Sequence, residues 1–172
     1  MLKDKSIKDD FVNTLKFEYV TENEIDEVLN LYKNVIRTTL TTWDDNYPNK
    51  ELLIKDINNK ELFALKNDKI IAVAYISNYF ESENASWKYN LKNPFRFARI
   101  CTAPEYQGLG VGTKMLTEII NHVKSLGCDG LQIAVYIKNT VAIKLYEKFN
   151  FIKTGEKNEY GFDYFKYELK FK

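Results

Sequence analysis

Gln107-Gly108-Leu109-Gly110-Val111-Gly112 is the most informative segment of the chain for its fold. It follows an apolar run over 95–102, and it opens directly into a segment over 111–126 whose apolar residues recur at helical spacing. Glycines let a loop turn tightly and bring backbone N–H groups against an anion, and the start of a helix adds partial positive charge. The stretch therefore predicts a strand, a turn and a helix whose N-terminus binds a phosphate or pyrophosphate.

Two familiar phosphate-binding patterns do not match this loop. A P-loop needs Gly-Lys followed by Ser or Thr, whereas Gly112 is followed by Thr113, Lys114 and Met115. A dinucleotide-binding fingerprint needs a third glycine where Thr113 stands. A turn that binds no ligand stays open as an alternative at this point.

The same reading extends outward along the chain. Alternating or continuous apolar runs predict strands over 17–20, 61–66, 69–78, 95–102, 131–136, 151–154 and 163–171. Helical spacing predicts helices over 25–36, 48–57, 111–126 and 139–149. In the second of these, Leu53, Ile54 and Ile57 are expected to face inward. Thr21 and Glu24 match a capping box, Asn67-Asp68 suits a hairpin turn with positive φ, and Gly127 suits a helix end. Residues 1–16 stay unassigned, as an extension or a short helix.

Composition excludes several classes of function. The chain has 172 residues, of which 45% are hydrophobic and 28% charged, as expected for a single domain over 1–172 with a real core. Lys and Arg number 25 against 24 acids, so a nucleic-acid partner is not expected. No segment suits a membrane span or a signal peptide, which predicts a cytoplasmic protein. Cys101, Cys128 and His122 form no metal-ligand pattern, so no metal is expected.

A second motif lies downstream of the glycine loop. Asn139, Ala142 and Tyr146 stand in the pattern Asn-x-x-Ala-x-x-x-Tyr, after Gln107-x-x-Gly110-x-Gly112. The pair of motifs, in this order, resembles the GCN5-related N-acetyltransferase (GNAT) superfamily over roughly residues 17–171. The resemblance implies an α/β fold with a mixed, mostly antiparallel sheet of about six or seven strands, flanked by about four helices, with a splayed parallel strand pair at the cofactor site.

The resemblance also implies acetyl-coenzyme A as co-substrate, lying where the strand over 95–102 splays from that over 131–136. The backbone amide of Ile100 would polarise the acetyl carbonyl, and the amides from Gln107 through Thr113 would bind the pyrophosphate. The cofactor-binding residues implied in this way are Ile100, Cys101, Thr102, Gln107, Gly108, Leu109, Gly110, Val111, Gly112, Thr113, Asn139, Ala142 and Tyr146. Ile100 and Tyr146 would be the catalytic ones.

Tyr146 is expected to act as general acid for the departing thiolate, because a phenol stays protonated at neutral pH. Asn139 lies seven residues earlier, two helical turns away, and so shares its helix face. Ordinary roles stay open for both, as a core tyrosine and a helix cap. Asn150 replaces the glycine usual in relatives, and asparagine tolerates the left-handed conformation there.

The general base is open. Many relatives carry a glutamate where this chain has Ala134. The remaining candidates are water or an acid on a loop near the acceptor: Glu81, Glu83, Asp44 or Asp45. Trp43 and Tyr47 either border the acceptor pocket or anchor the core, and the connection over 79–94 is either a lid or a packed loop.

The sequence thus predicts an N-acetyltransferase that moves acetyl from acetyl-coenzyme A to a primary amine by direct attack, through a tetrahedral intermediate. The acceptor would be a small cationic molecule or a peptide or protein amine. The alternative is a catalytically silent coenzyme A sensor or interaction module with the same fold. A homodimer is compatible with either function.

Overall fold

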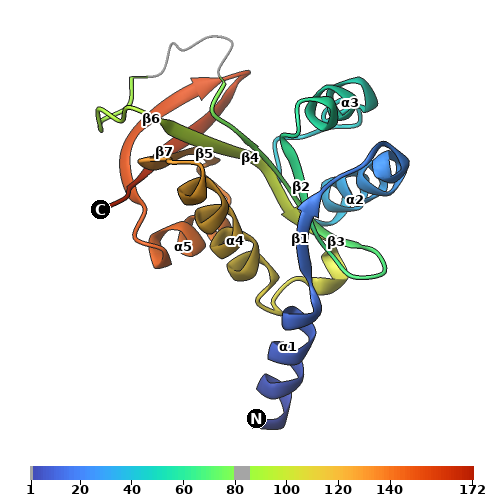
Figure 1. Ribbon diagram of the computed structural model, residues 1–172. Helices are drawn as coiled ribbons and strands as arrows, with labels where there is room; N and C mark the ends of the chain where they lie inside the picture. Colours follow the sequence, from blue (N-terminus) through green and yellow to red (C-terminus); the bar gives the residue numbers. More distant parts are fainter. Residues whose placement is uncertain (1, 80–85) are drawn as a thin grey trace. The chain divides into compact units, whose positions relative to one another are not determined.

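The structure is a computed structural model that describes residues 2–79 and 86–172. Figure 1 labels its helices and strands. The helices are α1 (Leu2–Thr14), α2 (Ile25–Thr38), α3 (Lys50–Asn58), α4 (Val111–Ser125) and α5 (Thr140–Lys148), with short 3₁₀ helices η1 (Glu22–Glu24) and η2 (Pro104–Tyr106). The strands are β1 (Lys16–Tyr19), β2 (Leu62–Lys66), β3 (Ile70–Ser77), β4 (Pro94–Thr102), β5 (Gly130–Tyr136), β6 (Ile152–Glu159) and β7 (Phe162–Lys170).

The strands form one mixed sheet in the order β1-β2-β3-β4-β5-β7-β6. The β1–β2, β2–β3, β5–β7 and β6–β7 pairs are antiparallel, whereas β4 and β5 are parallel. The predicted α/β fold with a mostly antiparallel sheet and one parallel pair is confirmed. The described chain has five helices rather than about four, and the additional one is α1.

The chain divides into two compact units, each described by itself. The first comprises Met1–Thr39, Trp43–Tyr75 and Arg99–Glu118, and the second comprises Leu40–Thr42, Ile76–Ala98 and Ile119–Lys172. Both β4 and α4 contribute residues to each unit. The prediction of a single domain over 1–172 stays a prediction.

The first unit is built around α2, whose apolar face packs with β2 and β3. Thr21 and Glu24 form the predicted capping box, in which the Glu24 carboxylate accepts the Thr21 N–H at 2.8 Å. The core cluster comprises Val20, Val28, Leu31, Tyr32, Val35, Leu53, Leu62, Ala64, Ile70, Val73 and Ala103. Two sequence expectations are wrong in α3. It begins at Lys50 rather than Pro48, because Asn49 caps it by accepting the Leu52 N–H, and Ile54 is 37% exposed.

The predicted β2–β3 hairpin is confirmed, but its turn differs from the expected one. Neither Asn67 nor Asp68 has a positive φ. The Asn67 side chain instead accepts the Lys69 N–H at 3.2 Å, which is an Asx turn. Residues 2–14, unassigned from sequence, form α1, and Phe11 stacks on Tyr106 with ring centroids 5.3 Å apart.

The second unit holds β5, β7 and β6 with α5. Gly127 ends α4 at a φ of 76°, and Asn150 follows α5 at a φ of 65°, as predicted for both positions. β6 runs from Ile152 to Glu159, longer than the predicted 151–154, because its polar second half pairs with β7. No helix in the described part of the chain is both long enough and apolar enough to cross a membrane.

Candidate active site

The glycine loop lies in the first unit, between η2 and α4. Gly108 and Gly110 have φ values of 75° and 91°, a region that side chains rarely adopt. The first bond of the α4 ladder runs from the Lys114 N–H to the Gly110 carbonyl at 3.0 Å. The N–H groups of the residues just before Lys114 therefore have no helical carbonyl to bind, which is the arrangement that suits an anion.

The loop is tied to the end of β4. The Gln107 side chain donates to the Thr102 carbonyl at 3.1 Å, and the Ala103 N–H donates to the Ile71 carbonyl at 2.9 Å. Lys114 forms an ion pair with Glu118 at 2.7 Å, within the same helix. The loop can therefore offer an anion a fixed set of backbone donors, with the nearby lysine already paired.

Ile100, Cys101 and Thr102 at the end of β4 are half-buried. Cys101 packs against the core of the first unit, and burial raises the pKa of its thiol above the ordinary range, so the thiol stays protonated. This environment suits a small apolar side chain that fills space in the core. Burial also lowers the pKa of His122. Within residues 2–79 and 86–172, no group of three or more His, Cys, Asp or Glu side chains is arranged to hold a metal ion.

Arg99, immediately before Ile100, has a φ of 48° within β4. Its guanidinium pairs with Asp56 on α3, donates to the Tyr47 hydroxyl at 3.3 Å and lies 4.4 Å from the ring centroid of Tyr75. The Tyr32 hydroxyl donates to the Arg99 carbonyl at 2.9 Å. This Arg99 cluster joins α2, α3, β3 and the loop before α3 at one residue of the strand.

The Arg99–Asp56 pair is almost fully buried, with side chains 9% and 4% exposed. Burial alone lowers the pKa of Arg99, but Tyr47, Asp56 and Tyr32 together raise it above its usual range. Burial raises the pKa of Asp56 to about 6 against the opposing effect of Arg99. Sequence reasoning missed this cluster. One signal was available: Asp56 stands on the face of α3 that also carries the buried Leu53.

Asn139 and Tyr146 lie in the second unit, on α5 and its cap. The Asn139 side chain accepts the Ala142 N–H at 3.2 Å, so the capping role is confirmed. Tyr146 is 2% exposed, and its ring meets that of Phe97 on β4 edge to face, with centroids 5.5 Å apart. Burial raises the pKa of Tyr146 above its ordinary value, which keeps the phenol protonated.

The parallel β4–β5 register covers only the first residues of each strand. It runs from Pro94↔Gly130 to Arg96↔Gln132, although β4 continues to Thr102 and β5 to Tyr136. Over the same residues β5 stays paired with β7 as far as Tyr136↔Tyr164. The loss of register on one side of β5 agrees with the predicted splayed pair.

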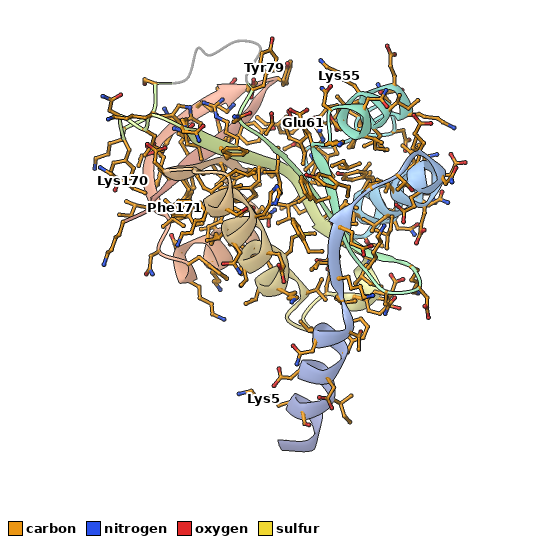
Figure 2. The ribbon with its side chains drawn as sticks, in the orientation of Figure 1. Lys5, Lys55, Glu61, Tyr79, Lys170 and Phe171 are labelled. Carbon is orange, nitrogen blue, oxygen red and sulfur yellow. The ribbon has the colours of Figure 1, made fainter. Side chains whose placement is uncertain are left out.

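The described part of the 79–94 connection belongs to the second unit and is held there by two acidic side chains. Glu168 accepts the Lys88 N–H at 2.8 Å and the Tyr89 N–H at 3.3 Å, and Asp129 accepts the Lys92 N–H at 2.6 Å. Residues 86–93 are therefore a packed loop. Tyr79, labelled in Figure 2, is the last described residue before the gap.

Of the four candidate acids, the structure describes Asp44 and Asp45. Glu81 and Glu83 lie outside the described residues. Asp44 and Asp45 are exposed, and Asp44 accepts the Asn46 N–H at 2.8 Å. Trp43 packs against the core of the first unit, edge to face with Tyr32 at 5.3 Å, which favours core anchoring for Trp43. The roles expected for the individual site residues stay predictions.

Comparison with known proteins places the chain in one protein family. A sequence model of the acetyltransferase (GNAT) family matches residues 24–151. Among solved structures, a protein from Salmonella typhimurium with its cofactor acetyl-CoA superposes with a TM-score of 0.71 at 13% identity, over 91% of this chain and 93% of that one.

Two curated relatives match shorter segments. The spermine/spermidine N(1)-acetyltransferase of Bacillus subtilis is 40% identical over 52 residues, which are 30% of this chain and 34% of the relative. N-alpha-acetyltransferase 50 of Danio rerio is 44% identical over 62 residues, 35% of this chain and 36% of the relative. The chain thus spans about a third of the length of these relatives, 34% and 36%.

Proposed function

Because the chain belongs to the acetyltransferase (GNAT) family, we propose that it transfers the acetyl group of acetyl-coenzyme A to a primary amine. The observation that carries the proposal is the backbone of the glycine loop. Gly108 and Gly110 have positive φ at the start of α4, and a Cβ added at Gly108 would meet no atom within 4 Å. An anion can therefore approach this backbone closely.

Acetyl-coenzyme A would supply a thioester, whose carbonyl is open to attack by an amine. The amides from Gln107 through Thr113 would bind its pyrophosphate, and Ile100 to Thr102 would lie along its pantetheine arm, with Cys101 as part of that strand. Leu109, Val111 and Gly112 contribute through their backbone. Asn139 and Ala142, at the start of α5, would contact the same arm. These assignments rest on the two motifs.

The reaction forms a C–N bond and breaks the C–S bond. The amine loses a proton to water or to a carboxylate, and its lone pair attacks the carbonyl carbon. The Ile100 N–H would stabilise the developing oxyanion. Tyr146 would give its proton to the leaving thiolate and recover one from solvent; burial keeps its phenol protonated at neutral pH.

The acceptor proposed is a small cationic amine. The Bacillus subtilis relative is named for spermine and spermidine, and Asp44 and Asp45 are exposed carboxylates that attract a cation. A protein N-terminus is the second candidate, because the Danio rerio relative is an N-alpha-acetyltransferase. A silent coenzyme A sensor is the alternative to either.

Thiol release from acetyl-coenzyme A, measured with spermidine and with an N-terminal peptide, tests the proposal together with calorimetry of coenzyme A binding. We expect micromolar to millimolar binding and turnover with at least one amine. Tyr146→Phe should retain binding and lower kcat by roughly 100-fold or more.

Gly110→Ala is the matched test of the loop, because its φ of 91° disfavours any side chain. It should weaken coenzyme A binding without changing the fold. Binding without turnover on any amine would favour the sensor. No heat with either form of the coenzyme would remove the whole proposal.

A further inference from the structure

The peptide unit between Arg99 and Ile100 is held on one side by a buried hydroxyl. The Tyr32 Oη donates to the Arg99 carbonyl at 2.9 Å, and Tyr32 itself is 1% exposed. The Arg99 carbonyl and the Ile100 N–H belong to the same planar peptide unit. This unit is trans, because the cis peptide bond among the described residues is Tyr47-Pro48. In a trans peptide the two groups point in opposite directions. The bond from Tyr32 therefore sets the direction of the Ile100 N–H.

The arrangement is costly for the fold, which points to a role beyond packing. A positive φ is unfavourable for a residue with a side chain, and Arg99 has a φ of 48°. Within the described residues, the buried Nε of Arg99 has no hydrogen-bond partner. Asp56, Tyr47 and Tyr75 nevertheless hold the side chain from three elements.

We infer that Tyr32 is a positioning residue for acetyl transfer: its hydroxyl, acting through the Arg99 carbonyl, aims the Ile100 N–H at the acetyl carbonyl oxygen. The Arg99–Asp56 pair maintains the backbone conformation on which this aim depends. The inference rests on the proposed function, because it needs a thioester carbonyl at Ile100. In this role Tyr32 would act through the Arg99 carbonyl and would not itself contact either substrate.

Tyr32→Phe removes the hydroxyl and keeps the ring against Trp43. We expect kcat to fall roughly 10- to 100-fold, because a donor to the oxyanion is misdirected, while the KM for acetyl-coenzyme A changes less than about twofold. Tyr164→Phe is the matched control, since it removes a phenol bond to Thr42 at 3.0 Å in the second unit. Its kcat should stay at the wild-type level.

A spectroscopic readout separates positioning from a general loss of stability. Acetyl-coenzyme A labelled with ¹³C at its carbonyl should shift downfield when it binds the wild type, and this shift should shrink by about half or more in Tyr32→Phe. If Tyr32→Phe does not fold, Asp56→Asn takes its place, with a reduced shift and a reduced kcat expected from release of Arg99.

The outcomes distinguish the two proposals. A wild type that binds no acetyl-coenzyme A would remove the proposed function and, with it, this inference. A wild type that turns over, with the same kcat and the same carbonyl shift in Tyr32→Phe, would remove the positioning role alone. A higher KM for acetyl-coenzyme A with an unchanged kcat in Tyr32→Phe would also overturn it, because that pattern indicates a lost binding contact.

Discussion

The burial of Tyr146 predicts how the stability of the protein depends on pH. The fold raises the pKa of Tyr146 above the value of about 10 of an unfolded tyrosine, so the folded state holds this proton more tightly. The stabilising contribution is complete below about pH 10 and is lost as the pH rises through the folded pKa. In urea unfolding at about pH 8 and about pH 10.5, Tyr146→Phe should lose less stability than wild type between the two pH values. Tyr160, which is 90% exposed, supplies the control: Tyr160→Phe should follow the wild type.

Asn150 and Arg99 both have a positive φ, but only the conformation of Asn150 could be predicted from the sequence. Asn150 at a φ of 65° was predictable, because asparagine tolerates the left-handed region. Arg99 at a φ of 48° was not, because arginine carries no such preference and the conformation costs about 1–3 kcal/mol. Contacts from Tyr32 and Asp56, 67 and 43 residues away in sequence, hold it there.

At the scale of the element, α5 combines a structural and a functional prediction at its cap. Asn139→Ala should cost about 1 kcal/mol of stability, because the Ala142 N–H loses its acceptor. If Asn139 also contacts the coenzyme arm, affinity for coenzyme A should fall several-fold in calorimetry. Asn49→Ala at the cap of α3 is the control, since it removes the same kind of bond at 2.9 Å and should leave that affinity unchanged. Equal affinities in both variants would reduce Asn139 to a cap.

Elements were the most predictable part of this chain. Their order and type follow from apolar spacing and from caps, as in α2 and α5, because these signals act between residues three or four apart. Boundaries such as the start of α3 were less accurate, since Pro48 and Asn49 each suit a helix start. Ile54 was expected to face the core but is 37% exposed, so helical spacing alone does not determine which apolar side chains of a helix are buried.

Long-range contacts in the second unit support a prediction at the scale of the whole molecule. Glu168 is fully buried on β7 and accepts the Lys88 and Tyr89 N–H groups, 80 and 79 residues away. Glu168→Gln should cost about 1–3 kcal/mol, because buried donors lose a charged acceptor, and the lower unfolding temperature should be evident in calorimetry. Glu156→Gln on β6, 67% exposed in its pair with Lys153, is the matched control and should change stability by less than about 0.5 kcal/mol. Equal losses in the two variants would contradict a structural role for Glu168.

The family resemblance, the order of the elements and the place of the glycine loop followed from the sequence, because each depends on residues close together in the chain. The tertiary structure alone decided that Arg99 leaves the regular strand conformation, that Asp56 is buried beside it, and that Glu168 holds residues 88 and 89. These features join residues 43 to 80 positions apart. Hydrogen bonds and ion pairs at such separations exist only once the chain has folded, and no local pattern of side chains encodes them.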